Sequence, residues 1–179
     1  EANYMEMVAR FASKFSNRPP TFQELCILQG FLLRARQSCN SAELITKQPL
    51  KHTPAKVAKF VELVVDLTQV QKRKVVVFSE WTQMISILKD QLTAININSV
   101  DFTGDQNIKQ RKEAVKRFST DPNCLVFFAS DAGGTGLDGL QKVSDAVIHI
   151  ELPWNPAKLD QRTGRIYRLG QKNPVDVYY

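Results

Sequence analysis

The pattern of hydrophobic positions along this 179-residue chain changes near residue 70. Before that point, apolar residues recur at helical spacing, as at Leu25, Leu28 and Leu32. Thr53 followed by Pro54 marks a helix start, because threonine caps helix N-termini and proline suits the first helical turn. The pattern therefore predicts N-terminal helices, interrupted by a linker at residues 40–52.

Beyond residue 70, short apolar runs alternate with amphipathic segments. The run at residues 74–79 is almost continuously apolar, which is typical of a strand buried on both faces of a parallel sheet. A β-α-β series of this kind predicts a mostly parallel sheet with helices on both faces. The expected strands are residues 74–79, 97–102, 124–130, 146–151 and 175–179, and the expected helices are residues 81–94, 107–119 and 155–169.

Composition narrows the class of protein but does not identify its function. Hydrophobic residues make up 43% of the chain and charged residues 23%, which predicts an ordinary globular fold. The net charge of +6 fits a polyanionic partner, although many basic proteins bind none. Three widely separated cysteines and two histidines offer no familiar zinc spacing and indicate reduced thiols. No apolar run approaches the ~20 residues of a membrane span.

Two short runs that follow expected strands carry the candidate chemistry. Residues 130–138 (SDAGGTGLD) form a glycine-rich turn, whose backbone can approach a phosphate closely. Residues 161–171 place Arg162, Arg165 and Arg168 three residues apart, a spacing that on a helix projects side chains from one face. Such arginines can reach the charge that develops on a transferring phosphoryl group. A flexible turn and a solvated basic helix face are the alternative interpretations.

The glycine run also matches a dinucleotide-binding fingerprint, at Gly134, Gly136 and Gly139. Only about six residues separate Gly139 from the next expected strand, whereas a β-α-β crossover needs roughly ten or more. The spacing therefore argues against a dinucleotide site and favours a turn that faces phosphate.

Taken together, these residues resemble the second RecA-like lobe of superfamily-two helicases, and more narrowly that of Swi/Snf-type DNA-dependent ATPases. The resemblance covers almost the whole chain, and several motifs occur in the family's order. Residues 74–81 (KVVVFSEW) resemble motif four, residues 130–138 motif five and residues 161–171 motif six. Residues 33–40 resemble the helical segment between the lobes, residues 103–118 the stretch after motif four, and residues 152–156 the tract after motif five.

This resemblance implies an α/β fold, a RecA-like parallel sheet flanked by helices, with an N-terminal helical extension. Residues 1–52 would form the extension and a linker toward a first lobe, and residues 53–179 the second lobe, cut short at its C-terminal end. The sequence of residues 164–171 (GRIYRLGQ) resembles that of prokaryotic members of the family more than that of eukaryotic ones.

The resemblance also implies roles for individual residues. Arg165 and Arg168 would act as arginine fingers on the nucleotide phosphates, with Arg168 the main one, and Gln161 would place the attacking water or the phosphate. The nucleotide-binding residues would be Gly134, Gly136, Asp138 and Gly164. The contacts to duplex DNA would come from Ser79, Trp81, Thr103, Gly104, Arg111, Ser130 and Trp154.

The chain departs from the family pattern in two places. Asp138-Gly139-Leu140-Gln141 stands where the family usually has Asn-Leu-Gln and is one residue longer, which leaves Gly139 without a role. Gly164 stands where many eukaryotic members have aspartate.

The given residues contain neither a phosphate loop nor an Asp-Glu-x-His tract, the groups that cradle phosphates and hold Mg²⁺. We expect both in a first lobe before Glu1, so ATP and Mg²⁺ would be bound mainly there and this fragment alone would be inactive. The expected partners are duplex DNA and that first lobe, with no metal ligands in this chain, no membrane and no obligate oligomer. The expected location is cytoplasmic, with the nucleoid in a prokaryote, or nuclear in a eukaryote.

Three alternatives remain open at this point. An RNA helicase lobe would share most motifs, although residues 152–156 and Gly170-Gln171 favour the Swi/Snf type. A nucleic-acid-binding module that works without ATP would use the same basic face. A protein-interaction scaffold built on a degenerate helicase lobe would have lost residues of motif six, whereas Gln161, Arg165 and Arg168 are all present.

Overall fold

The computed structural model describes residues 2–15, 18–131 and 138–179 and divides into two compact units, Glu1–Ala58 and Lys59–Tyr179. Gly134 and Gly136, two of the expected nucleotide-binding residues, lie outside the described residues. Within the described ranges, every helix is too short or too polar to cross a membrane. The functional boundary between the extension and the second lobe, expected after residue 52, stays a prediction.

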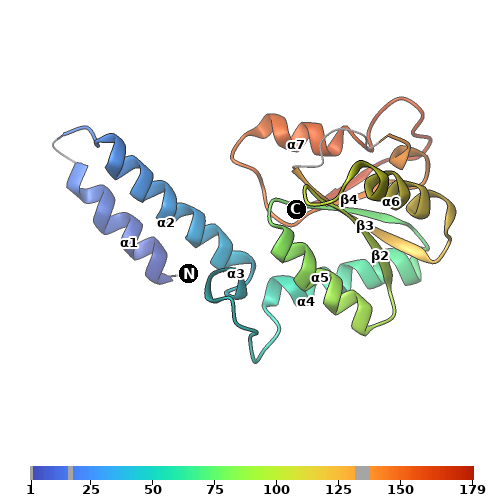
Figure 1. Cartoon of the computed structure of the whole chain (residues 1–179), viewed down its shortest axis with the longest axis horizontal. Coiled ribbons are helices and arrows are strands. Elements are labelled where there is room, and N and C mark those ends of the chain that lie inside the picture. Colours follow the sequence, from blue (N-terminus) through green and yellow to red (C-terminus); the bar gives the residue numbers. More distant parts are fainter. Residues whose placement is uncertain (1, 16–17, 132–137) are drawn as a thin grey trace. The chain divides into compact units, whose positions relative to one another are not determined.

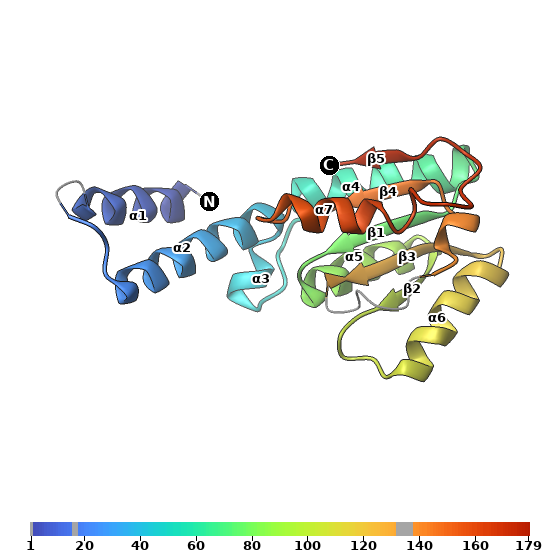
Figure 2. The same cartoon turned by 90° about the horizontal axis from the view of Figure 1, so that it is seen from above.

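The N-terminal unit is built on a helical hairpin of α1 (Ala2–Ala12) and α2 (Phe22–Asn40), which lie side by side in both views (Figures 1 and 2). Thr21 caps α2 in a reciprocal capping box with Glu24, so the helix starts where the polar residue follows two prolines. The rings of Phe11 and Phe31 join the two helices edge to face, with centroids 5.8 Å apart.

A short helix, α3 (Glu43–Thr46), lies inside the stretch expected to be a linker. Lys47 ends it in the left-handed conformation. The Nζ of Lys56 donates to Oδ1 of Asn40 at 2.7 Å, which ties the end of this stretch back to the end of α2. The segment between residues 40 and 52 is therefore ordered by local capping and by this hydrogen bond.

The second unit contains a five-stranded sheet in the order β2-β3-β1-β4-β5, with every neighbouring pair parallel. The predicted parallel sheet flanked by helices is confirmed. The central strand β1 is buried along its whole length because it has neighbours on both sides and helices on both faces. The strands are β1 (Val75–Ser79), β2 (Asn98–Phe102), β3 (Cys124–Ser130), β4 (Ala146–His149) and β5 (Asp176–Tyr178).

Helices cover both faces of this sheet (Figure 1). On one face, Phe60 of α4 (Ala55–Val65) meets Phe128, with ring centroids 6.2 Å apart, and α5 (Thr82–Ala94) buries Met84 and Leu88. On the other, Phe118 of α6 (Ile108–Thr120) packs on Phe127 at 5.2 Å. Alternate residues of one strand therefore supply two separate apolar layers.

Some element boundaries differ from the sequence expectation. The helix that begins with α4 widens into a π-helical turn, η2 (Asp66–Val70), before β1. A 3₁₀ turn, η4 (Leu140–Lys142), precedes β4 and was not expected. The last helix, α7 (Pro156–Thr163), ends six residues before the expected position near Leu169. Of the connection between β3 and β4, the structure describes Asp131 and residues 138–145, and these include η4.

We expect Phe127→Ala to destabilise this unit by about 3–5 kcal/mol, because the ring is fully buried against Phe102 and Phe118 and its loss leaves a cavity. Denaturant unfolding followed by tryptophan fluorescence measures this, since both tryptophans of the chain lie in this unit. Ile108→Ala is the control: that side chain is 73% exposed, and we expect a change within about 0.5 kcal/mol. Equal effects of the two substitutions would contradict this account of the core.

Candidate functional site

The parallel strands bring polar residues to one edge of the sheet. Ser79 ends β1 beside Ser130, which ends β3, and Phe78 of β1 is level with His149 at the end of β4. Asp131 follows β3 directly, and Glu151 follows β4 by two residues. Residues from motifs four, five and six are therefore neighbours in space, as expected of ligand sites at the carboxyl ends of parallel strands.

An open pocket of about 140 Å³ lies at this edge. It is lined by Phe78, Ser130, Asp131, Lys158, Gln161, Arg162 and Arg165. We call it the strand-end pocket. It contains Gln161 and Arg165, two of the three residues expected to be catalytic, and also Ser130, which was expected to contact DNA. The Ser130 Oγ is buried and has no hydrogen-bond partner among the described residues.

Arg162 is the most deeply buried charged side chain of this site, with 5% of the side chain exposed. Its Nε donates to Oδ1 of Asp131 at 2.7 Å, and its Nη2 lies 2.6 Å from the same oxygen. Its Nη1 donates to the backbone oxygen of Glu151 at 3.3 Å. The sequence placed Arg162 in a run of three basic residues, but only the structure shows that it turns inward.

Glu151 is a buried carboxylate next to this arginine. Its Oε1 accepts hydrogen bonds from Ser79 Oγ at 2.9 Å and from the backbone N–H of Glu80. Burial raises the pKa of Glu151, although those two hydrogen bonds and the charge of Arg162 act in the opposite direction. Ser79 is fully buried in this arrangement, so its hydroxyl serves the Glu151 carboxylate and does not lie on the surface.

His149 is stacked between two aromatic rings beneath α7. Its ring centroid lies 5.7 Å from that of Phe78 and 5.6 Å from that of Tyr179, with interplanar angles of 16° and 13°. Its Nε2 lies 3.1 Å from Oγ1 of Thr163. Burial and, to a smaller extent, the positive charge of Arg162 together lower the pKa of His149 to about 4. The imidazole is therefore neutral at neutral pH.

The expectation that Arg165 and Arg168 share a helix face is wrong. The helix α7 ends at Thr163, and the residues after it form turns. Gly164 lies where an added Cβ would come within 2.9 Å of the backbone oxygen of Asp160, so the chain packs closely as it leaves the helix. A second bend follows at Gly170, whose φ is +97°.

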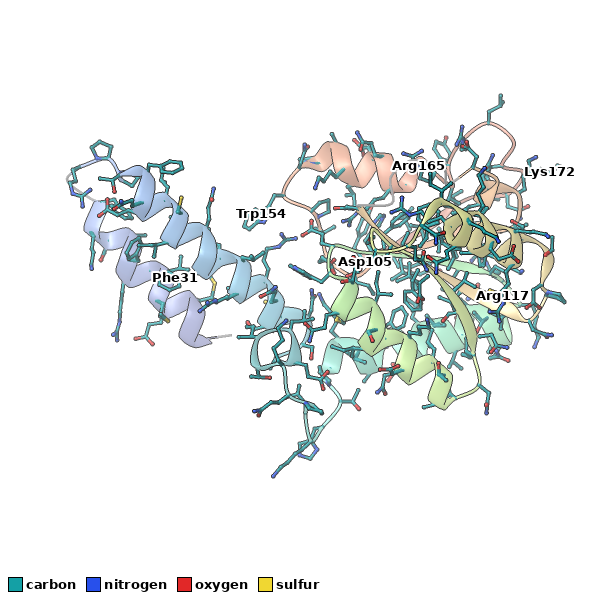
Figure 3. All side chains as sticks on the ribbon, in the orientation of Figure 1. Phe31, Asp105, Arg117, Trp154, Arg165 and Lys172 are labelled. Atoms are coloured by element: carbon teal, nitrogen blue, oxygen red, sulfur yellow. The ribbon has the colours of Figure 1, made fainter. Side chains whose placement is uncertain are left out.

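These turns send the two arginines into different surroundings. Arg165 is half-buried and lines the strand-end pocket, and Figure 3 labels it beyond the end of α7. Arg168 is more exposed, and its Nη1 is ion-paired with Oδ1 of Asp138. The expected main finger is thus paired with the residue expected near the ribose. Gly164 contributes close backbone packing at the end of α7.

The expected DNA contacts are spread along the same edge. Arg111 donates to the backbone oxygens of Thr103 and Gly104 at 3.1 and 2.9 Å and lies over the ring of Phe102, so it braces that loop. The backbone N–H of Trp81 donates to Ser79 Oγ at 3.2 Å.

Trp154 is an exposed member of this set. It lies in the loop before α7, with 68% of the residue exposed (Figure 3). Its indole forms part of the exposed surface of this loop.

The sequence analysis assigned no individual role to Gly139 or Gln171, and the structure shows a structural role for each. Gly139 has a φ of +100° and starts η4, a conformation that favours glycine. Gln171 donates from Nε2 to the backbone oxygen of Ser144 and accepts from the backbone N–H groups of Lys172 and Asn173. It anchors the loop that carries Arg168 to the start of β4.

The charges at the strand-end pocket suit phosphate better than a divalent cation. Lys158, Arg162 and Arg165 line it, and its carboxylate, Asp131, is ion-paired with Arg162. Among the described residues, no group of three or more histidines, cysteines or carboxylates is placed to hold a metal ion. The described residues of this chain therefore fit an anionic ligand, and a Mg²⁺ ion would need ligands from elsewhere.

Comparison with known proteins gives consistent relatives. A model of the helicase conserved C-terminal domain matches residues 55–170. The human lymphoid-specific helicase is 32% identical over 84% of this chain, and INO80, a chromatin-remodeling ATPase of Saccharomyces cerevisiae, is 32% identical over 69%. An ATP-dependent helicase of Mycoplasma pneumoniae is 30% identical over 82%. The chain spans 19%, 8% and 14% of these three proteins.

Solved structures agree on the fold. The Sulfolobus solfataricus SWI2/SNF2 ATPase core in complex with dsDNA superposes with a TM-score of 0.81 at 21% identity, over 99% of this chain and 37% of that one. The C-terminal part of the Fun30 ATPase domain superposes with a TM-score of 0.67 at 22% identity, over 91% of this chain and 54% of that one. The predicted RecA-like fold is confirmed.

We expect acid to destabilise the second unit through His149. The unfolded imidazole takes up a proton near pH 6.5 and the folded one only near pH 4, so between these values the unfolded state binds more protons and stability falls as pH falls. The loss amounts to about 3 kcal/mol. Unfolding of wild type and of His149→Gln, measured at pH 7.5, 6, 5 and 4, should show a steeper decline for wild type. Parallel curves would contradict a neutral, buried imidazole.

Proposed function

Because the chain belongs to the helicase conserved C-terminal domain family, we propose that it forms the second RecA-like lobe of an ATP-dependent DNA translocase. Its relatives include helicases and chromatin-remodeling ATPases, so the resemblance to Swi/Snf-type enzymes is confirmed. Those relatives come from bacteria, yeasts and human, and the prokaryotic origin stays a prediction. Residues 53–179 are the proposed lobe, and residues 1–52 the extension toward its partner lobe.

The observation that supports the proposal most is the position of α7 at the carboxyl ends of the strands. It brings Gln161 and Arg165 to one pocket with the Ser130 hydroxyl and the Lys158 ammonium. In the proposed mechanism, the γ-phosphate of ATP approaches this pocket when the two lobes close. Arg165 then stabilises the negative charge of the transferring phosphoryl group, and Gln161 places the attacking water.

Arg168 is the proposed main finger. Its guanidinium is held by the Asp138 carboxylate, at a position where 40% of the arginine side chain is exposed. A nucleotide phosphate carries more charge than one carboxylate, so it would draw Arg168 away from Asp138. Asp138 would then be available to the ribose. The glycines at 134 and 136 would bring backbone N–H groups close to the same nucleotide.

The remaining groups would come from a first lobe. That lobe would supply the phosphate loop and the ligands of Mg²⁺, an ion that neutralises charge on the β- and γ-phosphates when bound. This chain alone would therefore not hydrolyse ATP. Duplex DNA is the proposed polymer, since the archaeal relative is described in complex with it, and the proposed location is the cell compartment that holds the DNA.

The proposed DNA surface comprises the exposed part of the strand-end edge. It includes the exposed Gly104 and Trp154 and the half-buried Trp81, with Thr103 and Arg111 holding the loop after β2 in shape. Ser79 is not included, because its hydroxyl is buried on Glu151. Ser130 is assigned to the nucleotide side, because it lines the strand-end pocket.

We expect Arg168→Ala in the full-length protein to lower DNA-stimulated ATP hydrolysis about 10³-fold or more, because the transferring phosphoryl group loses its main cationic partner. DNA binding should persist, since Arg168 is not part of the proposed DNA surface. Arg117→Ala is the matched control, because its side chain is half-exposed and is ion-paired with Asp121 at the end of α6. Hydrolysis assays with and without duplex DNA, together with binding measurements, test this.

The outcomes separate the alternatives. Stimulation by RNA and not by duplex DNA would favour an RNA helicase lobe. If neither polymer stimulates ATP hydrolysis, or if Arg168→Ala leaves the rate of hydrolysis unchanged, a binding module that works without ATP is favoured. Robust hydrolysis by residues 1–179 alone would contradict the need for a first lobe.

We expect Trp154→Ala to weaken binding of the full-length protein to duplex DNA about tenfold, equivalent to about 1.4 kcal/mol. The side chain is exposed, so the core should keep its stability. Phe22→Ala, which removes an 80% exposed aromatic ring from the N-terminal unit, is the control. Titration of a fluorescent duplex measures both affinities, and equal affinity of wild type and Trp154→Ala would remove this residue from the DNA surface.

A further inference from the structure

We propose that Arg162 is a positioning residue of this site: it fastens α7 to three strand ends and so holds Gln161 and Arg165 toward the nucleotide. The inference rests on the proposed function, because it needs a phosphoryl-transfer reaction to act on. It differs from the finger roles of Arg165 and Arg168, since Arg162 would not touch the nucleotide.

The contacts of Arg162 come from three different segments. Asp131 follows β3, Glu151 follows β4, and Glu80 follows β1 with its Oε1 at 3.9 Å from the Arg162 Nη2. All three lie at the same edge of the sheet. One planar guanidinium therefore joins the ends of β1, β3 and β4 to the helix that follows them.

Arg162 and its neighbour Gln161 on α7 differ in exposure. Gln161 is exposed, whereas only 5% of the Arg162 side chain is exposed. Both nevertheless line the strand-end pocket, together with Arg165. A shift or rotation of α7 would therefore move Gln161 and Arg165 relative to the phosphate, and small displacements of catalytic groups slow a reaction strongly.

Lysine should not replace this arginine. The guanidinium donates a hydrogen bond from Nε to Asp131 and another from Nη1 to the backbone oxygen of Glu151, and its Nη2 makes a close ion pair with Asp131. An ammonium group is a single point of charge on a flexible stem. Lys158 already occupies the other carboxylate oxygen of Asp131, at 3.5 Å. The expected role thus depends on the shape of the arginine as well as on its charge.

A purely structural role would show a different pattern of effects. Removing Arg162 alone leaves the Asp131 carboxylate partly buried without its main partner, which destabilises a fold whether or not the arginine positions anything. Removing both charges relieves that penalty. A double substitution, Arg162→Met with Asp131→Asn, therefore separates stability from positioning.

The test uses the full-length protein with saturating duplex DNA. We expect the double variant to unfold within a few degrees of wild type, while kcat for ATP falls at least about tenfold and KM changes less than about threefold, because the positioned groups act in the transition state. Arg162→Lys should show the same loss of kcat. Arg117→Met, which removes a more exposed arginine of the same unit, should leave kcat and KM unchanged.

Each result decides the proposal. A stable double variant with the kcat of wild type would overturn it and leave Arg162 a structural residue only. If every Arg162 variant unfolds, the single variant Asp131→Asn is measured instead, because in it Arg162 keeps its hydrogen bond to the backbone oxygen of Glu151. An unchanged kcat in Asp131→Asn also overturns the proposal. If the wild-type protein shows no DNA-stimulated hydrolysis, the proposed function itself is refuted. The wild-type measurement therefore distinguishes this failure from failure of the positioning role.

Discussion

The constraint on which the rest of this structure depends is the common direction of all five strands. Because every neighbouring pair is parallel, every strand ends at the same edge of the sheet. Ser79, Ser130 and His149 meet there although they are far apart in the sequence. An antiparallel arrangement of the same strands would have divided these residues between two edges.

Charge burial at that edge is what holds the last helix in place. Removing charged side chains from water is costly unless each has a partner. Arg162 pairs with Asp131, and the buried Glu151 carboxylate accepts hydrogen bonds from Ser79 Oγ and the backbone N–H of Glu80. Beneath the same helix, the stack of Phe78, His149 and Tyr179 adds an apolar layer around a neutral imidazole. The site is therefore formed by polar side chains that also complete the packing of the sheet.

Local sequence signals placed most elements within a few residues. The apolar run at residues 124–130 and the amphipathic segment at residues 107–119 predicted β3 and α6 within a residue or two, because short-range burial and the capping box at Asn107 act there. The end of α7 was missed: its basic spacing continues past Thr163, but the close backbone packing at Gly164 and the bend at Gly170 turn the chain. Spacing alone could not show this, since the turns depend on what the chain packs against.

The sequence by itself determined the β-α series and the presence of Gln161, Arg165 and Arg168, because these rest on patterns within a few residues. Only the tertiary structure decided which arginine is buried. Arg162, Arg165 and Arg168 have equal spacing, but one pairs with Asp131, one lines the strand-end pocket and one pairs with Asp138. Those partners come from distant segments, and a side chain's environment is set by what folding brings beside it.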